Sequence, residues 1–118
     1  MKLRDIINAF KTTEQLAEIK GLTNNDQWEV YKVRKNLRTH IDFMNERLSA
    51  LQAKYREFAD ENGVLNGDKA IEYNKELEEL NNMEIDMNDY DIPVVHMAEG
   101  ITFKIMEPLE NIIEFTPD

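Results

Sequence analysis

Residues 26–60 read DQWEVYKVRKNLRTHIDFMNERLSALQAKYREFAD, and the spacing of their apolar side chains decides the fold. Eight successive intervals of three or four positions cover 28 residues, a mean of 3.5, which is the period of a coiled coil. The pattern predicts one long helix over residues 26–60. Its apolar seam packs either within the molecule, which we favour, or against another subunit. The seam consists of Val30, Val33, Leu37, Ile41, Met44, Leu48, Leu51, Tyr55 and Phe58.

A turn and a second helix follow the long helix. Asn62-Gly63 and Asn66-Gly67 interrupt the apolar pattern, because Asn and Gly tolerate positive φ and glycine is costly inside a helix. Asp68 is a suitable N-cap, and the helical spacing then resumes. The pattern predicts a helix over residues 68–81 that packs antiparallel on the long one, as a helical hairpin. Its apolar positions are Ala70, Tyr73, Leu77 and Leu80.

The N-terminal residues predict another helix. Leu3, Ile6, Ile7 and Phe10 fall at i, i+3, i+4 and i+7, which places them on one helical face. The helix either runs on to a C-cap at Gly21 or breaks near Thr12 and Thr13, and we favour one helix. The stretch TNND at 23–26 supplies capping side chains for the long helix.

The C-terminal third changes period. In MEIDMNDYDI (residues 83–92), apolar and polar residues alternate, which predicts a strand. Residues 92–97 and 101–105 predict further short strands, with a turn at Gly100, and residues 106–113 return to helical spacing. The expected fold is therefore mainly α with a small β element (α+β). It has an antiparallel helical hairpin, short strands near the C-terminus and a terminal short helix, in a single domain of residues 1–118.

Composition limits the class of protein. Hydrophobic residues at 42% and charged residues at 32% describe a chain that folds. Without cysteine there are no disulfides, thiolate metal sites or thiol catalysis. The sequence shows neither a signal peptide nor an apolar run of the roughly 20 residues that span a bilayer. We expect an intracellular location, no secretion by a signal peptide and no membrane partner.

Charge is divided unevenly along the chain, whose net charge is −10. Residues 1–60 carry 11 Lys/Arg and 9 Asp/Glu, a balance of +2, whereas residues 61–118 carry 3 and 15, a balance of −12. An acidic half repels phosphate backbones, so we expect protein partners and no nucleic acid.

Four carboxylates, Glu84, Asp86, Asp89 and Asp91, lie within the alternating stretch. A calcium loop starting at Asp86 would require an oxygen ligand at Tyr90, a glycine at Asp91 and a glutamate at Met97, and it fails at all three. We therefore expect no metal and no cofactor. The four carboxylates form a solvated face that binds a partner protein.

Residues typical of catalysis are scarce. His40 and His96 are the only histidines and match no metal-binding spacing, and Ser49, the only serine, lies mid-helix without a nucleophile-elbow pattern. We expect that the protein is not an enzyme. Trp28 and Tyr31, near the start of the long helix, form either an aromatic contact patch or, more commonly, part of the packing.

The order of several short segments resembles a family of small tailed-phage and prophage proteins catalogued as a domain of unknown function. The resemblance covers most of the chain, from MKLRDIINAF through VRKNL to IIEF. Its most specific part is ENG (61–63) followed by YNKELEELNNMEID (73–86). It implies a phage accessory or virion-associated role and carries over no catalytic residues.

Two functional hypotheses follow. The first is a non-enzymatic structural or assembly protein that contacts phage subunits and can also form a homo-oligomer. The second is a soluble inhibitor whose acidic half mimics nucleic acid and occupies the groove of a basic host nuclease or defence protein.

Overall fold

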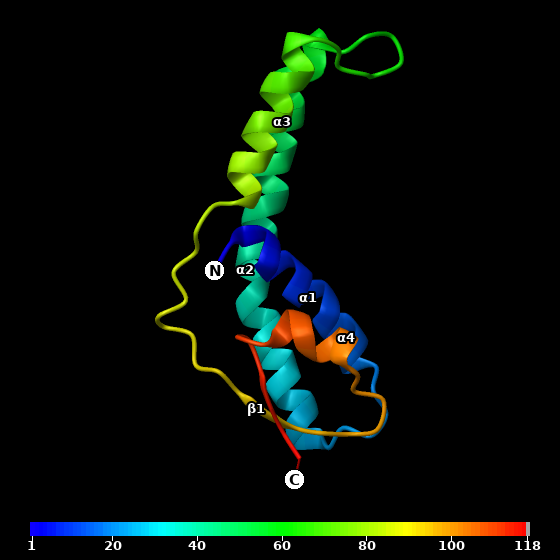
Figure 1. Cartoon of the computed structure of the whole chain (residues 1–118), viewed down its shortest axis with the longest axis vertical. Coiled ribbons are helices and arrows are strands. Elements are labelled where there is room, and N and C mark those ends of the chain that lie inside the picture. Colours follow the sequence, from blue (N-terminus) through cyan, green and yellow to red (C-terminus); the bar gives the residue numbers. More distant parts are fainter. Residues whose placement is uncertain (118) are drawn as a thin grey trace.

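The structure, a computed structural model, describes residues 1–117 and has the predicted mainly helical α+β fold (Figure 1). It is elongated, measuring 55 × 30 × 20 Å. The elements in chain order are α1 (Leu3–Ala17), α2 (Asn24–Tyr55), the 3-10 helix η1 (Arg56–Phe58), α3 (Asp68–Asn81), β1 (Val94–His96), α4 (Phe103–Met106), the 3-10 helix η2 (Glu107–Leu109) and β2 (Glu114–Thr116).

Helix α2 is the central element, because α1, α3 and β1 all pack against it. α1 lies against its N-terminal half, and α3 runs back along its C-terminal half after the chain reverses in residues 59–67 (Figure 1). The side chain of Thr23 caps α2 by accepting a hydrogen bond from the Asp26 backbone N–H at 3.2 Å. The structure thus confirms a long helix, which begins at Asn24 and passes into η1 at Arg56, its capping by Thr23, and a second helix at residues 68–81. The predicted N-cap at Asp68 is wrong, because Gly67 is the cap residue and Asp68 is the first residue of α3.

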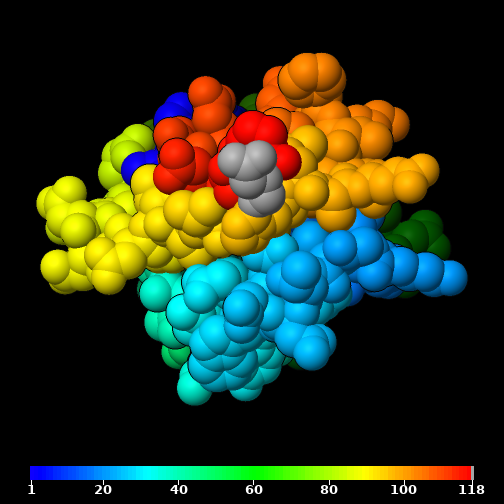
Figure 2. Space-filling model, turned by 90° about the horizontal axis from the view of Figure 1, so that it is seen from below, coloured from blue at the N-terminus to red at the C-terminus, as the bar shows by residue number. Residues whose placement is uncertain are grey.

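The core lies in the body formed by α1, the first half of α2 and the C-terminal segment. Its members come from both ends of the chain, so the fold depends on contacts between distant residues. The bottom view shows the C-terminal segment covering this half of the molecule (Figure 2). The largest fully buried side chains include Leu3, Ile6, Leu16, Val30, Leu37, Val95, Leu109, Ile112 and Ile113.

Helix α1 is continuous through its two threonines. The Thr12 and Thr13 hydroxyls donate hydrogen bonds to the carbonyls of Asn8 and Phe10, so both side chains are satisfied inside the helix. The helix ends at Ala17 rather than at the glycine that follows four residues later. The favoured prediction of one helix is confirmed, and the predicted C-cap at Gly21 is wrong.

Three predictions for the C-terminal third are wrong. Residues 83–87 form one isolated bridge, between Lys2 and Glu84, instead of a strand. Residues 101–105 form no strand, because α4 begins at Phe103 and buries its Ile105. The helical stretch ends at Leu109, and the last regular element is a strand, β2.

The small sheet has two parallel strands, β1 and β2. Val95 pairs with Phe115 in its centre, and α4 and η2 form the crossover that a parallel pair requires. The strand predicted within residues 92–97 is therefore confirmed as β1. Gly100, at φ 99°, forms the predicted turn before the crossover.

We expect Leu37→Ala to lower the free energy of unfolding by about 2–5 kcal/mol, because Leu37 is fully buried in the middle of α2 and the variant leaves a cavity. Urea denaturation followed by circular dichroism measures the change. Lys35→Ala, at an exposed position of the same helix, is the control and should stay within about 0.5 kcal/mol. A Leu37 variant as stable as that control would show that the core is placed wrongly.

Candidate functional site

The most exposed regular part of the molecule is the arm, which we define as residues 48–81. It comprises the last two turns of α2, η1, the loop 59–67 and α3, and it extends away from the body (Figure 1). All residues of α3 lie within the described range 1–117, and none of them is buried. Apolar side chains on both helices of the arm, such as Leu51 and Leu77, are only half-buried. Two helices alone therefore leave the seam partly open to solvent.

Polar contacts fix α3 against α2. The Tyr55 hydroxyl donates to one Glu76 carboxylate oxygen at 2.6 Å, and the Lys54 ammonium lies 2.7 Å from the other. The Glu76 hydrogen bond raises the pKa of Tyr55 to about 12, and Lys54 and Tyr55 lower the pKa of Glu76. The Tyr55 ring also meets Tyr73 edge-on at 5.6 Å between centroids. These contacts set the register of the hairpin.

The tip of the arm is organised by one carboxylate. Asp60 accepts hydrogen bonds from the backbone N–H groups of Asn62 at 2.8 Å and Val64 at 3.0 Å, and these bonds lower its pKa. Gly63 and Gly67 adopt positive φ angles of 76° and 63°, so the Asn-Gly turns occur where the sequence predicts them. The ordered loop holds Val64 at the surface, 51% exposed.

The four carboxylates predicted to bind a partner lie on an extended segment and do not share one strand face. Glu84 pairs with the Met1 ammonium at 3.0 Å, and Asp86 accepts a hydrogen bond from the Asn88 N–H at 2.8 Å. Asp89 and Asp91 line a shallow groove of about 240 Å³ beside α2. All four are exposed, but the structure brings only Asp89 and Asp91 to a common groove.

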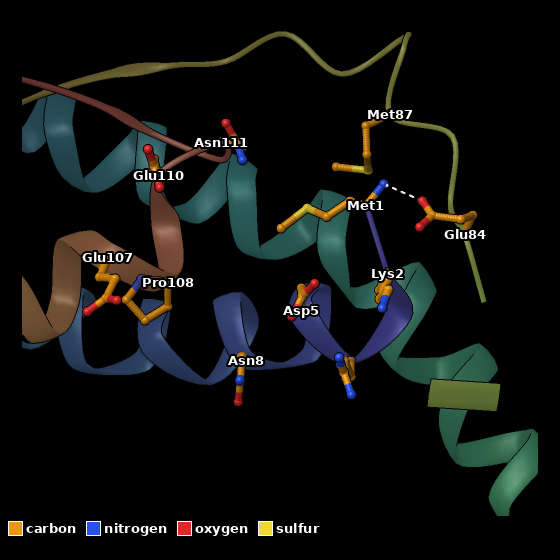
Figure 3. Close-up of a pocket in the computed structure, with 11 residues that line it drawn as sticks. Met1, Lys2, Asp5, Asn8, Glu84, Met87, Glu107, Pro108, Glu110 and Asn111 are labelled. Atoms are coloured by element: carbon orange, nitrogen blue, oxygen red, sulfur yellow. Dashed lines mark hydrogen bonds and ion pairs between the residues drawn. The ribbon is translucent and has the colours of Figure 1, made fainter. Parts of the chain in front are cut away.

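A larger groove of about 820 Å³ lies between the N-terminal turn of α1 and the crossover helices (Figure 3). Figure 3 shows Glu84 reaching the Met1 ammonium on one side, while Glu107 and Glu110 project from the crossover. Basic and acidic groups both line it, and its residues include no serine, cysteine or histidine. The lining residues are Met1, Lys2, Arg4, Asp5, Asn8, Glu84, Met87, Glu107, Pro108, Glu110 and Asn111.

An exposed aromatic pair lies on the first turns of α2. Trp28 and Tyr31 are 56% and 54% exposed, and their rings stack at 5.4 Å. The Lys32 ammonium lies 5.9 Å from the Trp28 ring, at the range of a cation–π contact. The exposure of both rings rules out core packing, and the role of an aromatic contact patch stays a prediction.

One buried carboxylate was not singled out by the sequence. Asp26 is 3% exposed. Its Oδ1 accepts a hydrogen bond from the His96 backbone N–H at 3.3 Å and lies 3.1 Å from the His96 Nδ1. Burial raises the pKa of Asp26, but its hydrogen bonds with His96 and Thr23 outweigh burial and lower the pKa overall. The pair joins β1 to the first turn of α2 across 70 residues, so only the tertiary structure could reveal it.

The described residues 1–117 contain no group of three or more His, Cys, Asp or Glu side chains that could hold one metal ion. Within the same range, no helix combines the length and the apolar character needed to cross a membrane. Comparison of the chain with protein-family models, curated proteins and solved structures gave no match.

Asp26→Asn tests the buried pair, because it removes the charge and keeps the shape of the side chain. The folded pKa of Asp26 lies below its unfolded value. The ionised carboxylate therefore stabilises the fold above about pH 4, and this contribution is lost as the pH falls through the folded pKa. We expect the variant to be about 1 kcal/mol less stable than the native protein at about pH 5. The two proteins should converge at an acidic pH below the folded pKa of Asp26.

Thermal unfolding at both pH values measures this difference. Asp42→Asn, an exposed position on the same helix, is the control and should match the native protein throughout. A destabilisation by Asp26→Asn that does not change with pH would contradict the assigned ionisation of Asp26.

Proposed function

We propose that this chain is a non-enzymatic protein-interaction protein whose arm is the contact element. The observation that carries the proposal is the apolar seam of the arm, which stays partly exposed. All residues of α3 lie in the described range, and none of them is buried. Short helices usually owe their stability to packing of an apolar face. A protein that covers this seam would bury the remaining apolar surface of both helices.

The geometry of the arm supports binding rather than catalysis. A loop already ordered by Asp60 loses little conformational entropy when a partner binds, and Val64 and Phe58 supply exposed apolar contacts at the tip. Ile71, 67% exposed, adds an apolar contact on the outer side of α3. The resemblance to phage proteins makes a phage structural or assembly subunit the partner that we propose for this surface.

The second candidate function is that of an inhibitor that mimics nucleic acid and occupies the groove of a basic host protein. Asp89 and Asp91 are exposed on the extended segment after α3, and the structure records no ion pair for either within residues 1–117. α3 adds exposed carboxylates at Glu72, Glu78 and Glu79. This spread of negative charge favours a basic partner, and high salt would weaken such a complex more than one held by the apolar seam.

Photo-crosslinking in the native host tests the role of the arm. We expect a benzophenone amino acid at position 71 to capture one defined protein, because Ile71 lies on the exposed side of α3. The control carries the same group at Thr39, an exposed position on the half of α2 that belongs to the body. Mass spectrometry identifies the adducts.

The same set of adducts separates the two functions. A partner captured at position 71 and absent at position 39 supports the arm as the contact element. A third variant carries the group at position 89, and capture there alone, lost at high salt, would favour the acidic mimic. Equal labelling at positions 71 and 39 would contradict a specific role for the arm.

A further inference from the structure

A second apolar surface adjoins the base of the arm, in a groove of about 510 Å³ where α1, α2 and the end of α3 meet. We call it the α1–α2 groove. Its floor is apolar and comes from two helices that the sequence separates by some 30 positions. The floor consists of Ile7 and Phe10 from α1 and Ile41, Met44 and Leu48 from α2.

The dimensions of the groove suit a helix. Its α1 bank extends from Arg4 to Glu14, which corresponds to about 15 Å at the rise of an α-helix and would accommodate nearly three turns. Amphipathic helices bind such grooves through apolar residues at i, i+3, i+4 and i+7. Met44 has an unbranched, adaptable side chain that can follow the shape of an incoming apolar residue. The floor therefore matches the apolar face of a short helix.

The charge around the groove is opposite to that of the chain as a whole. Arg4 and Lys11 line it, and Arg4 lies 3.8 Å from the Glu78 carboxylate of α3. The Arg34 and Arg38 guanidinium carbons lie 5.2 and 5.4 Å from the Phe10 ring centroid. Glu14 is the only acidic lining residue, and it is itself 3.7 Å from Arg34. A cationic rim on a protein of net charge −10 favours an acidic occupant and disfavours a basic one.

We propose that the α1–α2 groove binds an acidic amphipathic helix of a partner protein. The apolar floor takes the hydrophobic face of that helix, and Arg4 and Lys11 face its flanking carboxylates. The inference rests on the proposed interaction function. The groove shares only Leu48 and Asn81 with the arm, and the charge variants in the groove and the crosslinker at position 71 test the two surfaces separately.

A designed 18-residue peptide is the probe, with leucine at i, i+3, i+4 and i+7 and glutamate on its flanks. One control peptide replaces the leucines by serine, and another replaces the glutamates by lysine. Fluorescence anisotropy at physiological salt gives the affinities, and amide chemical shifts in the full chain locate the contact. We expect micromolar binding of the acidic amphipathic peptide only, with shifts confined to the two banks of the groove.

A charge variant tests the rim without altering the core. Lys11→Glu with Asn45→Glu changes one exposed residue on each bank of the groove and should weaken the peptide complex on the order of tenfold. Lys20→Glu with Asn74→Glu makes the same two substitutions at exposed positions outside the groove and should leave the affinity unchanged. Circular dichroism verifies that both variants fold.

Four results would overturn the proposal. These are no binding of the acidic amphipathic peptide, equal binding of its serine version, chemical shifts outside the groove, or equal effects of the two double variants.

Sedimentation of the protein alone tests whether a second copy of the chain occupies the groove. A dimer that the Lys11→Glu and Asn45→Glu variant dissociates would assign the groove to self-association. Crosslinking at position 71 tests partner binding by the arm independently of these results.

Discussion

The structure depends on one constraint: a single apolar seam on α2 must be covered along a helix of 32 residues. The first half of the seam is enclosed, and Val30, Val33 and Leu37 are at most 2% exposed. The second half has only α3 opposite it, and there Leu48 and Leu51 remain half-exposed. One continuous apolar pattern thus contributes to the closed core of the body and to the open surface of the arm. The point where the seam changes from buried to partly exposed marks the boundary between body and arm.

The body is closed by contacts between residues far apart in the chain. The buried Val95, Leu109 and Ile112 all follow the arm in sequence, yet they pack in the same cluster as the α1 residues Ile6 and Leu16. The Tyr90 hydroxyl donates to the Ile112 carbonyl at 2.7 Å and ties the extended segment to this cluster, and burial raises the pKa of Tyr90 to about 12. The arm is therefore an insertion between two parts of one core.

Sequence patterns predicted the local elements well and the long-range ones poorly. The seam and the Asn-Gly turns gave α2 and the bounds of α3, since both depend on neighbouring residues. Apolar and polar residues alternate in residues 83–87 because Ile85 and Met87 pack on the core while their neighbours face solvent. This alternate burial does not require a neighbouring strand, so the pattern did not lead to a strand. The Asp26–His96 pair and the α1–α2 groove join residues from separate elements, which periodicity does not relate. The partner-binding role of the four carboxylates stays a prediction.

The stiffness of α2 has a mechanical consequence. A helix of this length spans about 48 Å and bends little, so it acts as a stiff rod that joins the arm to the body. A lateral force on the tip near Val64 becomes a torque at the other end, where Asp26 joins the helix to β1. Loads applied to the tip are thus concentrated on a few contacts of the body, far from the point where they act.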